Sequence, residues 1–326
     1  MNVVVLGDAN ADLSAPVRAF PAEGDDCPLL DLGWGSGGAG VNVATALALL
    51  GAEVHLLARV GTDPAAEVAL RAARGAGVDL GAIQRDPALA TGLCFAVVSP
   101  GGERTFFSHR GANHALATPE LGALFEGAGH LHVCGHALLE GGQRDTALTL
   151  IAEASRRAIS VSLDLCLPLL RAHPEAAIEL APTLAILFGN EPELSLVAAS
   201  HAPAGAAPGP EAALDLLEHS GARCIALKRG ARGSTIAEGG CREEIPAFAI
   251  AAVDSTGAGD AHVGATLFAI LRGASPPLAA RLGNAMGALT TTRRGAAEAL
   301  PTRAELSAFL DARGAPAALK ALLEPR

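Results

Sequence analysis

The sequence predicts an α/β protein with an open, mostly parallel β-sheet that helices cover on both faces. Two observations lead to this prediction. Short β-rich runs alternate with longer alanine-rich runs of helical pattern along the chain. The chain also has 326 residues, 50% of them hydrophobic, which is enough to bury one large core with a smaller appendage. In such folds ligands bind outside the carboxyl ends of the strands, so candidate functional residues are sought there.

The first expected strand is the apolar run Val3–Leu6, which has no basic flank and is too short for the apolar core of a signal peptide. Further strands are expected at the β-rich runs Val54–Arg59, Leu131–Val133, Val161–Leu163, Leu184–Phe188 and Cys224–Lys228. Helices are expected at the alanine-rich runs between and after them, Val41–Leu50, Pro64–Ala76, Thr146–Ala158, Pro210–Ser220, Ala261–Leu271 and Pro277–Thr291.

Two segments interrupt this alternation, Asp12–Gly35 and Thr91–Phe107. In the second, the β-rich runs Gly92–Val98 and Arg104–Phe107 flank the turn Pro100-Gly101-Gly102, which is the pattern of a β-hairpin. The two segments are therefore the candidates for the appendage.

Charge and composition narrow the class of partner. The chain carries 24 basic and 34 acidic residues, a net charge of -10, and has no basic stripe interleaved with aromatic residues, which argues against nucleic-acid binding. No segment approaches the ~18 uninterrupted apolar residues of a membrane span, so no membrane association is expected. The six cysteines are scattered without a CxxC pair, as in a reduced, cytoplasmic protein.

The segment Asp254–Asp260 carries the clearest chemical pattern. Gly257, Ala258 and Gly259 have little or no side chain, so their N–H groups can approach a ligand closely, and the apolar run that follows predicts a helix. The first N–H groups of a helix have no internal partner and lie at the positive end of its dipole, which makes them an anion site. Asp260, in the same turn, can accept the proton of a substrate hydroxyl and is the candidate general base.

This segment closely resembles the C-terminal signature of the ribokinase-like (PfkB) family of carbohydrate and nucleoside kinases. A second motif, Gly37–Ala44 leading into a helical run, resembles that family's N-terminal glycine motif. The resemblance extends over essentially the whole chain. It implies a ribokinase-like three-layer α/β/α sandwich with a small β-sheet lid. The lid would comprise residues 12–35 and 91–113, and the nucleotide- and substrate-binding core residues 1–11, 36–90 and 114–326.

The resemblance also implies the activity, an ATP-dependent and Mg²⁺-dependent transfer of the γ-phosphoryl group to a sugar hydroxyl. The family's sugar-binding aspartate corresponds to Asp12, which follows the first strand with Asn10 beside it. A carboxylate and a carboxamide suit a polyol, because both accept several O–H donors. By the same resemblance, further sugar contacts are expected from Gly37, Gly38, Asn42 and Arg110.

On the nucleotide side, Asn190-Glu191-Pro192-Glu193 matches the family's NxxE motif, which implies Mg²⁺ and phosphate handling by Asn190 and Glu193 through water. An ordinary helix start with Glu at the positive end is the alternative for this segment. The resemblance further implies nucleotide contacts from Lys228, Gly230, Gly233 and Asn284. It also implies a monovalent-cation site, for K⁺, formed by Asp254 with the loop Thr292–Ala296.

Other functions stay open at this level. Gly33–Gly38 matches the GxGxxG pattern of dinucleotide-binding proteins, although it does not follow the first strand. A non-catalytic sugar-binding relative is a further alternative. Among kinases, a ribokinase- or fructokinase-like enzyme is favoured, with a 2-keto-3-deoxygluconate or nucleoside kinase as the alternative. A sugar is favoured over a nucleoside because one Trp, nine Phe and no Tyr leave few rings to stack on a base. The acceptor, the hydroxyl and the oligomeric state are not determined, though pairing of lids into a homodimer occurs in the family.

Overall fold

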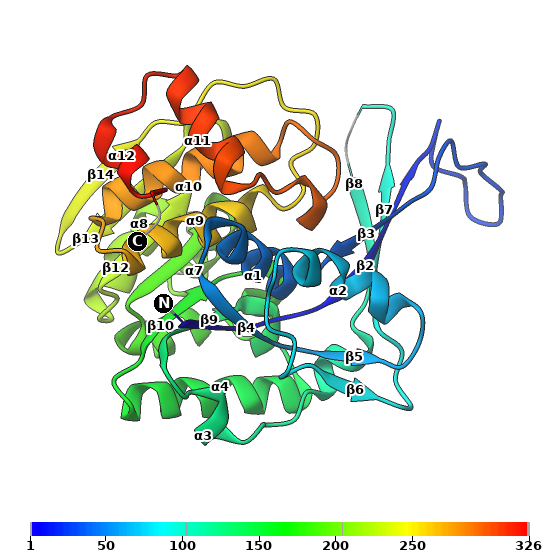
Figure 1. The fold of residues 1–326 in the computed structure, drawn as a ribbon, viewed down its shortest axis with the longest axis horizontal. Coiled ribbons are helices and arrows are strands. Elements are labelled where there is room, and N and C mark those ends of the chain that lie inside the picture. Colours follow the sequence, from blue (N-terminus) through cyan, green and yellow to red (C-terminus); the bar gives the residue numbers. More distant parts are fainter. Residues whose placement is uncertain (1, 102–103, 204, 325–326) are drawn as a thin grey trace.

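The computed structural model describes residues 2–101, 104–203 and 205–324. Its central sheet has eight strands in the order β14-β13-β12-β11-β10-β9-β1-β4 (Figure 1). The strands from β12 to β4 pair in parallel, and β13 and β14 extend the sheet in antiparallel. The bounds are β1 Asn2–Leu6, β4 Glu53–Leu57, β9 Ala128–Cys134, β10 Ser160–Asp164, β11 Ile186–Asn190, β12 Cys224–Lys228, β13 Ser234–Glu238 and β14 Cys241–Ile245.

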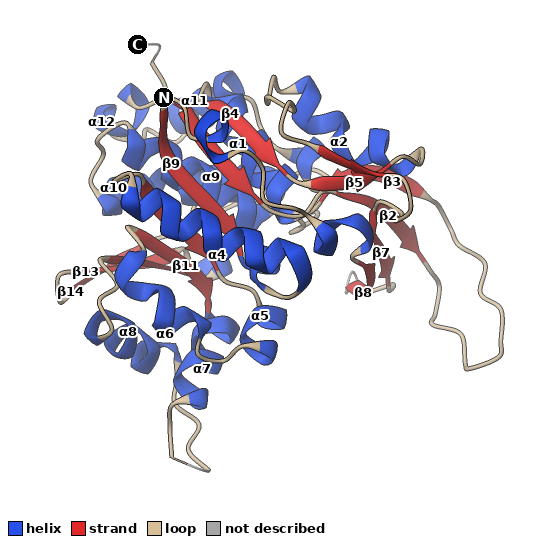
Figure 2. Ribbon diagram, turned by 90° about the horizontal axis from the view of Figure 1, so that it is seen from below, coloured by secondary structure: helices blue, strands red, loops and turns tan. Residues whose placement is uncertain are grey.

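Side chains alternate between two hydrophobic cores, one on each face of this sheet. On β1, Val3 and Val5 belong to one core, and Val4 and Leu6 belong to the other. This is the pattern of a strand buried on both faces. The sheet therefore lies between two helical layers, as Figure 2 shows, and the expected α/β/α sandwich is confirmed.

The helices divide between these two cores. Those packed on the Val3 side are α1 Ala39–Leu50, α2 Ala65–Gly75, α9 Ala258–Leu271, α10 Pro276–Thr290, α11 Arg303–Ala312 and α12 Ala317–Ala321. Those packed on the Val4 side are α4 Gly141–Arg156, α5 Leu167–Ala172, α6 Ala176–Leu180, α7 Glu191–Ser200 and α8 Pro210–His219, with the short α3 Leu121–Leu124 at the edge. No helix among the described residues is long and apolar enough to cross a membrane.

A second, four-stranded sheet extends from one end of the sandwich (Figure 1). The strand order of this sheet is β3-β2-β7-β8. The bounds are β2 Asn10–Pro16, β3 Gly33–Gly37, β7 Gly92–Val98 and β8 Arg104–His109. The pair β7 and β8 is the hairpin that the sequence predicts; Gly102 of its turn lies outside the described residues. A third sheet pairs the short strands β5 Arg59–Gly61 and β6 Gln84–Asp86 in parallel.

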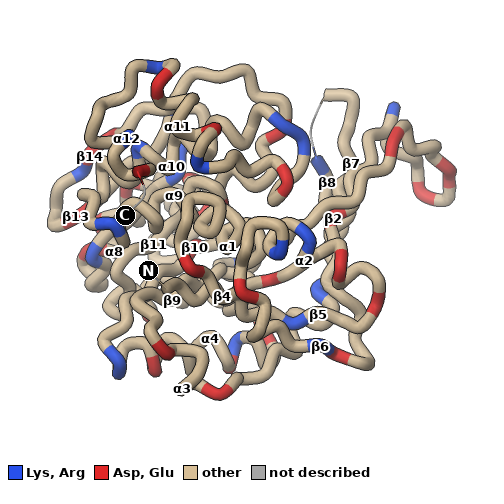
Figure 3. The backbone as a smooth tube through the Cα atoms, viewed as in Figure 1, with Lys and Arg blue, Asp and Glu red and all other residues tan. Residues whose placement is uncertain are grey.

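Charged residues are distributed over the whole molecule. Figure 3 shows basic and acidic positions interspersed across the sandwich, and several acidic positions on the long loop between β2 and β3. The acidic residues that give the net charge of -10 are therefore spread over the molecule.

Candidate active site

The start of α9 brings small residues and a carboxylate to the carboxyl-end edge of the central sheet. Gly257 caps the helix with a left-handed backbone, φ 74°, and a Cβ atom there would lie 3.1 Å from the Cα of Ala296. Glycine meets both constraints because it has no Cβ atom. Asp260 lies in the first turn, where the helix N–H groups have no partner within the helix.

Asp260 is half-buried, and Asn42 of α1 donates a hydrogen bond from Nδ2 to its Oδ2 atom at 2.7 Å. The pKa of Asp260 is raised to about 6. Burial and the charge of Asp164 raise this pKa, whereas the Asn42 hydrogen bond and the charge of Lys228 lower it. A carboxylate with this pKa is ionised at neutral pH and still holds a proton more tightly than an exposed aspartate, which suits a general base.

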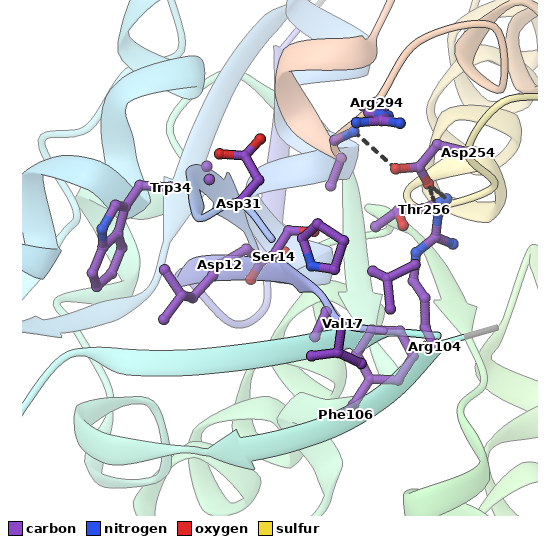
Figure 4. A pocket seen from close by; sticks show the side chains of 18 of the residues that line it. Asp12, Ser14, Val17, Asp31, Trp34, Arg104, Phe106, Asp254, Thr256 and Arg294 are labelled. Carbon is purple, nitrogen blue, oxygen red and sulfur yellow. Dashed lines mark hydrogen bonds and ion pairs between the residues drawn. The ribbon is translucent and has the colours of Figure 1, made fainter. Parts of the chain in front are cut away.

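A cavity of about 870 Å³ lies between the small sheet and the loops around α9 (Figure 4). Asp12, Asp31, Trp34 and Phe106 border it from the small sheet and its loop, and Thr256 borders it from the α9 side. Several of these positions were not foreseen from the sequence.

Asp12 is a half-buried carboxylate in the wall of this cavity. Burial, together with the charges of Glu298 and Asp260, raises the pKa of Asp12 to about 7. Its Oδ1 atom and the Oδ1 atom of Asn42 are buried acceptors without a partner among the described residues. A Cβ atom at Gly37 would overlap the Asp12 carboxylate, so glycine is required beside it. Asp12 borders the cavity, whereas Asn42 borders neither cavity and contacts Asp260; an unpartnered acceptor at a cavity wall is suited to the hydroxyl groups of a ligand.

A second, smaller cavity of about 220 Å³ reaches Asp260 from the other side. It is bordered by Asn190, Glu193, Lys228 and Gly259, four residues that the sequence assigns to phosphate chemistry. The Lys228 side chain is only 14% exposed, yet its pKa is raised, because Asp164 and Glu193 outweigh the effect of burial; its Nζ atom donates to Oδ1 of Asp164 at 2.6 Å. The cavity therefore contains a fixed positive charge and the amino end of α9.

Asn190 and Glu193 form a capping box at the start of α7. The Asn190 side chain accepts from the Glu193 N–H at 2.9 Å, and Glu193 accepts from the Asn190 N–H at 2.7 Å. Burial nevertheless raises the pKa of Glu193 to about 7. The motif is thus both an ordinary helix cap and part of the cavity wall, and its charge is suited to a nearby cation.

Two predicted sugar contacts are engaged elsewhere. Asn10 accepts a hydrogen bond from Asn113 at 2.9 Å, and Arg110 donates to Asp8 at 3.0 Å and to Gln143. Neither Asn10 nor Arg110 borders the two cavities described above. Their roles in sugar binding remain predictions.

The remaining nucleotide-side residues lie along one edge of the sandwich. Gly230 begins a short 3₁₀ turn, and Gly233 has φ 95° and packs against the backbone after β14. Asn284 of α10 donates to the carbonyl oxygens of Ile245 and Pro246 at 3.0 and 3.3 Å. These contacts hold the β12–β13 turn, the segment after β14 and α10 together.

Asp254 is held by backbone N–H groups and by an arginine. Its carboxylate accepts hydrogen bonds from the backbone N–H groups of Thr256 at 2.7 Å and Gly295 at 3.0 Å, and it forms an ion pair with Arg104 of β8 (Figure 4). Among residues 2–101, 104–203 and 205–324, no group of three or more His, Cys, Asp or Glu side chains is placed to hold a metal ion.

Sequence reasoning missed several residues of the site. Asp164 follows the expected strand Val161–Leu163 directly, so the rule that ligands bind at strand carboxyl ends could have found it. Glu298, by contrast, reaches the cavity from a 3₁₀ turn, accepts from Ser36 N–H at 2.8 Å and pairs with Arg71. No local pattern marks it.

Comparison with known proteins identifies the class. Residues 1–303 match the profile of the pfkB family carbohydrate kinases, so the chain belongs to that family and is a phosphotransferase with an alcohol group as acceptor. The recognised resemblance is thereby confirmed. Gly33–Gly38 forms β3 and the approach to α1, not a turn after the first strand, as a dinucleotide site would require.

Individual relatives support the same class. The chain is 28% identical to an ATP-dependent ribose-1-phosphate kinase of Halopiger xanaduensis (96% of this chain, 99% of the relative). It is 30% identical to a 2-dehydro-3-deoxygluconokinase of Bacillus subtilis (85% and 87%). The fold matches an Arabidopsis thaliana ribokinase solved with ribose and ATP, with a TM-score of 0.81, 23% identity and coverage of 94% and 98%.

Proposed function

We propose that this carbohydrate kinase transfers the γ-phosphoryl group of ATP to a hydroxyl group of a neutral sugar, with Asp260 as general base. The position of Asp260 carries the proposal. It lies at the amino end of α9, borders the cavity of Lys228 and Glu193, and its charge acts on Asp12 in the larger cavity. A hydroxyl held by Asp12 would therefore lie near a base and near an anion site.

On the acceptor side, the Asp12 and Asn42 oxygens without partners would accept sugar O–H groups, with Gly37 and Gly38 allowing close approach. Asn42 also orients the Asp260 carboxylate through its hydrogen bond. Positioning of the hydroxyl against the base is a large part of catalysis in phosphoryl transfer.

On the nucleotide side, Lys228 and the α9 N–H groups would bind phosphate, with Asn190 and Glu193 beside them. The donor set suits Mg²⁺ held through water, because a buried carboxylate and an amide border the same cavity. Bound Mg²⁺ would neutralise charge on the phosphates. A solved Escherichia coli chain of this fold, 22% identical with a TM-score of 0.82, contains ATP and Mg²⁺. Gly230, Gly233 and Asn284 would shape the edge that holds the base.

The small sheet would act as a lid, comprising residues 12–35 and 91–113 as the sequence predicts. By closing over the acceptor it would exclude water and limit hydrolysis of ATP.

The small sheet has a second face, turned away from the cavity. Phe95 and Phe107 contact one another on this outer face, opposite Phe106, because successive side chains of a strand alternate. We extend the proposal to a homodimer through this outer face; sedimentation of a monomer at assay concentration would contradict it.

The charges around the larger cavity favour a neutral acceptor over a sugar acid or a phosphosugar. Four acidic residues border it, Asp12, Asp31, Asp254 and Glu298, against three arginines, Arg18, Arg104 and Arg294, and Arg104 is already paired with Asp254. A second candidate is a nucleoside. The cavity has room for a sugar with a base attached, because its volume of about 870 Å³ lies high in the usual range of about 300–1,000 Å³ for small-molecule sites. Trp34 and Phe106 border it and supply rings against which a base could stack.

The test is ADP release by the wild-type protein with ATP, Mg²⁺ and a panel of acceptors: ribose, fructose, adenosine, 2-keto-3-deoxygluconate and ribose 1-phosphate. We expect a neutral sugar to give the highest kcat/KM. A preference for adenosine would select the second candidate. If no acceptor raised ADP release above that of ATP alone, the proposed reaction would be wrong.

A further inference from the structure

Arg104 connects the small sheet to the loop that leads into α9. It is the first residue of β8, and its Nη2 atom pairs with Oδ1 of Asp254 (Figure 4). Its Nη1 atom lies 3.5 Å from Oγ of Ser255. Arg104, Asp254 and Thr256 all border the larger cavity, so the ion pair closes one side of it.

Both oxygens of the Asp254 carboxylate accept from N–H donors. Oδ1 accepts from the Thr256 N–H at 2.7 Å and pairs with Arg104, and Oδ2 accepts from the Gly295 N–H at 3.0 Å. Burial raises the pKa of Asp254, but these hydrogen bonds and the Arg104 charge outweigh it, so the pKa is lowered. The group is an ionised carboxylate with a cation already beside it.

We propose that the Arg104 guanidinium is the built-in cation of Asp254, so that this enzyme needs no K⁺, and that the small sheet orders the 254–257 loop through it. The inference rests on the proposed function and replaces the cation site that the family resemblance implies.

Electrostatics gives the physical reason. A K⁺ ion at Asp254 would lie beside the guanidinium, and like charges at such separations repel. The side chains of Arg104 and Asp254 are 17% and 12% exposed, so solvent screens this repulsion less than at the surface. The planar guanidinium also donates in two directions at once, from Nη2 to the Asp254 carboxylate and from Nη1 toward the Ser255 hydroxyl.

The first experiment compares wild-type protein in KCl and in tetramethylammonium chloride at equal ionic strength. We expect equal kcat/KM and equal melting temperature in the two salts. A rate about tenfold higher in KCl, or a K⁺-specific rise in melting temperature, would overturn the inference. The melting comparison needs no acceptor, so it decides the inference even if no acceptor is phosphorylated and the proposed function itself fails.

The second experiment uses Arg104→Ala and Arg104→Lys, with Arg85→Ala as the matched control. Arg85 forms a surface ion pair with Glu67 at 3.0 Å, outside both cavities. We expect Arg104→Ala to lose about tenfold in kcat/KM without K⁺, Arg104→Lys to lose less, and Arg85→Ala to match wild type. KCl should then restore part of the Arg104→Ala rate. An Arg104→Ala variant that equals wild type, or that K⁺ does not stimulate, would contradict the assignment.

Discussion

At the scale of single residues, the pKa of Asp260 determines how the rate depends on pH. The base must be ionised, and burial raises its pKa to about 6, so kcat/KM should rise with pH through a limb near pH 6. The Asn42 hydrogen bond lowers this pKa. Removing it in Asn42→Ala should therefore move the limb to higher pH, because the charged form loses its donor.

The measurement is a pH profile of kcat/KM for the wild type and for Asn42→Ala, with Thr45→Ala of the same helix as control. The Thr45 hydroxyl donates to the Val41 carbonyl of its own helix. A limb that stayed at the wild-type pH in Asn42→Ala would show that Asp260 is not the group that titrates.

Gly37 tests the acceptor side at the same scale. A Cβ atom there would overlap the Asp12 carboxylate, so Gly37→Ala must displace that side chain. We expect a raised KM for the sugar, with the KM for ATP unchanged, because Lys228 and Glu193 line a separate cavity. Gly75→Ala is the control, since a Cβ atom at Gly75 meets no neighbouring atom. An unchanged sugar KM in Gly37→Ala would remove Asp12 from the acceptor site.

At the scale of elements, two helices begin with the same capping box but in different surroundings. Asn190 and Glu193 start α7 beside the smaller cavity, whereas Thr302 and Glu305 start α11 outside it. Burial raises the pKa of Glu193 to about 7, whereas Arg293 and the Thr302 hydrogen bonds lower the pKa of Glu305 to about 2.

This pair separates capping from chemistry. Glu193→Gln and Glu305→Gln should each change the free energy of unfolding by roughly 1 kcal/mol or less, because glutamine can still cap a helix. Of the two, Glu193→Gln alone should raise the KM for Mg²⁺ and ATP. Equal kinetics for both variants and wild type would reduce the Asn190–Glu193 motif to an ordinary helix start.

The elements that sequence could predict are those with strong periodic patterns. The buried strands β1, β4, β9, β10, β11 and β12 each contain part of an apolar run, and α1, α9 and α10 are alanine-rich. The strands β13 and β14 were missed. The residues of β14, Cys-Arg-Glu-Glu-Ile, are mostly exposed at the edge of the sheet, so no hydrophobic alternation marks them.

At the scale of the whole molecule, a buried active site costs stability at neutral pH. Asp12 ionises with a pKa of about 7 in the folded protein, against about 3.9 in an unfolded chain. The unfolded state therefore loses its proton first, and the free energy of unfolding should fall as pH rises from about 4 to about 7.

Asp12→Asn removes this cost. The variant should melt at a higher temperature than wild type at pH 8 and at the same temperature near pH 4, where both forms are neutral. Thermal melts across this range check the prediction, with Asp31→Asn, an exposed position at the same cavity, as control. A destabilised Asp12→Asn at pH 8 would contradict the burial of an ionised Asp12.

The parts of the site that sequence could predict are its local motifs. Gly257–Asp260 and Asn190–Glu193 lie where each motif places them, because neighbours in the chain determine a helix start. The contacts Lys228–Asp164 and Arg104–Asp254 join residues 64 and 150 positions apart. They depend on strand order and on the position of the small sheet, which one sequence without its fold does not specify.

The central claim is that Asp260 deprotonates the acceptor hydroxyl, and single-turnover phosphoryl transfer in Asp260→Asn tests it most directly. With enzyme, acceptor and Mg²⁺ in excess over ATP, we predict that the variant binds ATP and loses about 10²–10⁴ in the rate of sugar phosphate formation. Asp145→Asn, an exposed position on α4, should match wild type. Sugar phosphate formation by Asp260→Asn at the wild-type rate would contradict the claim.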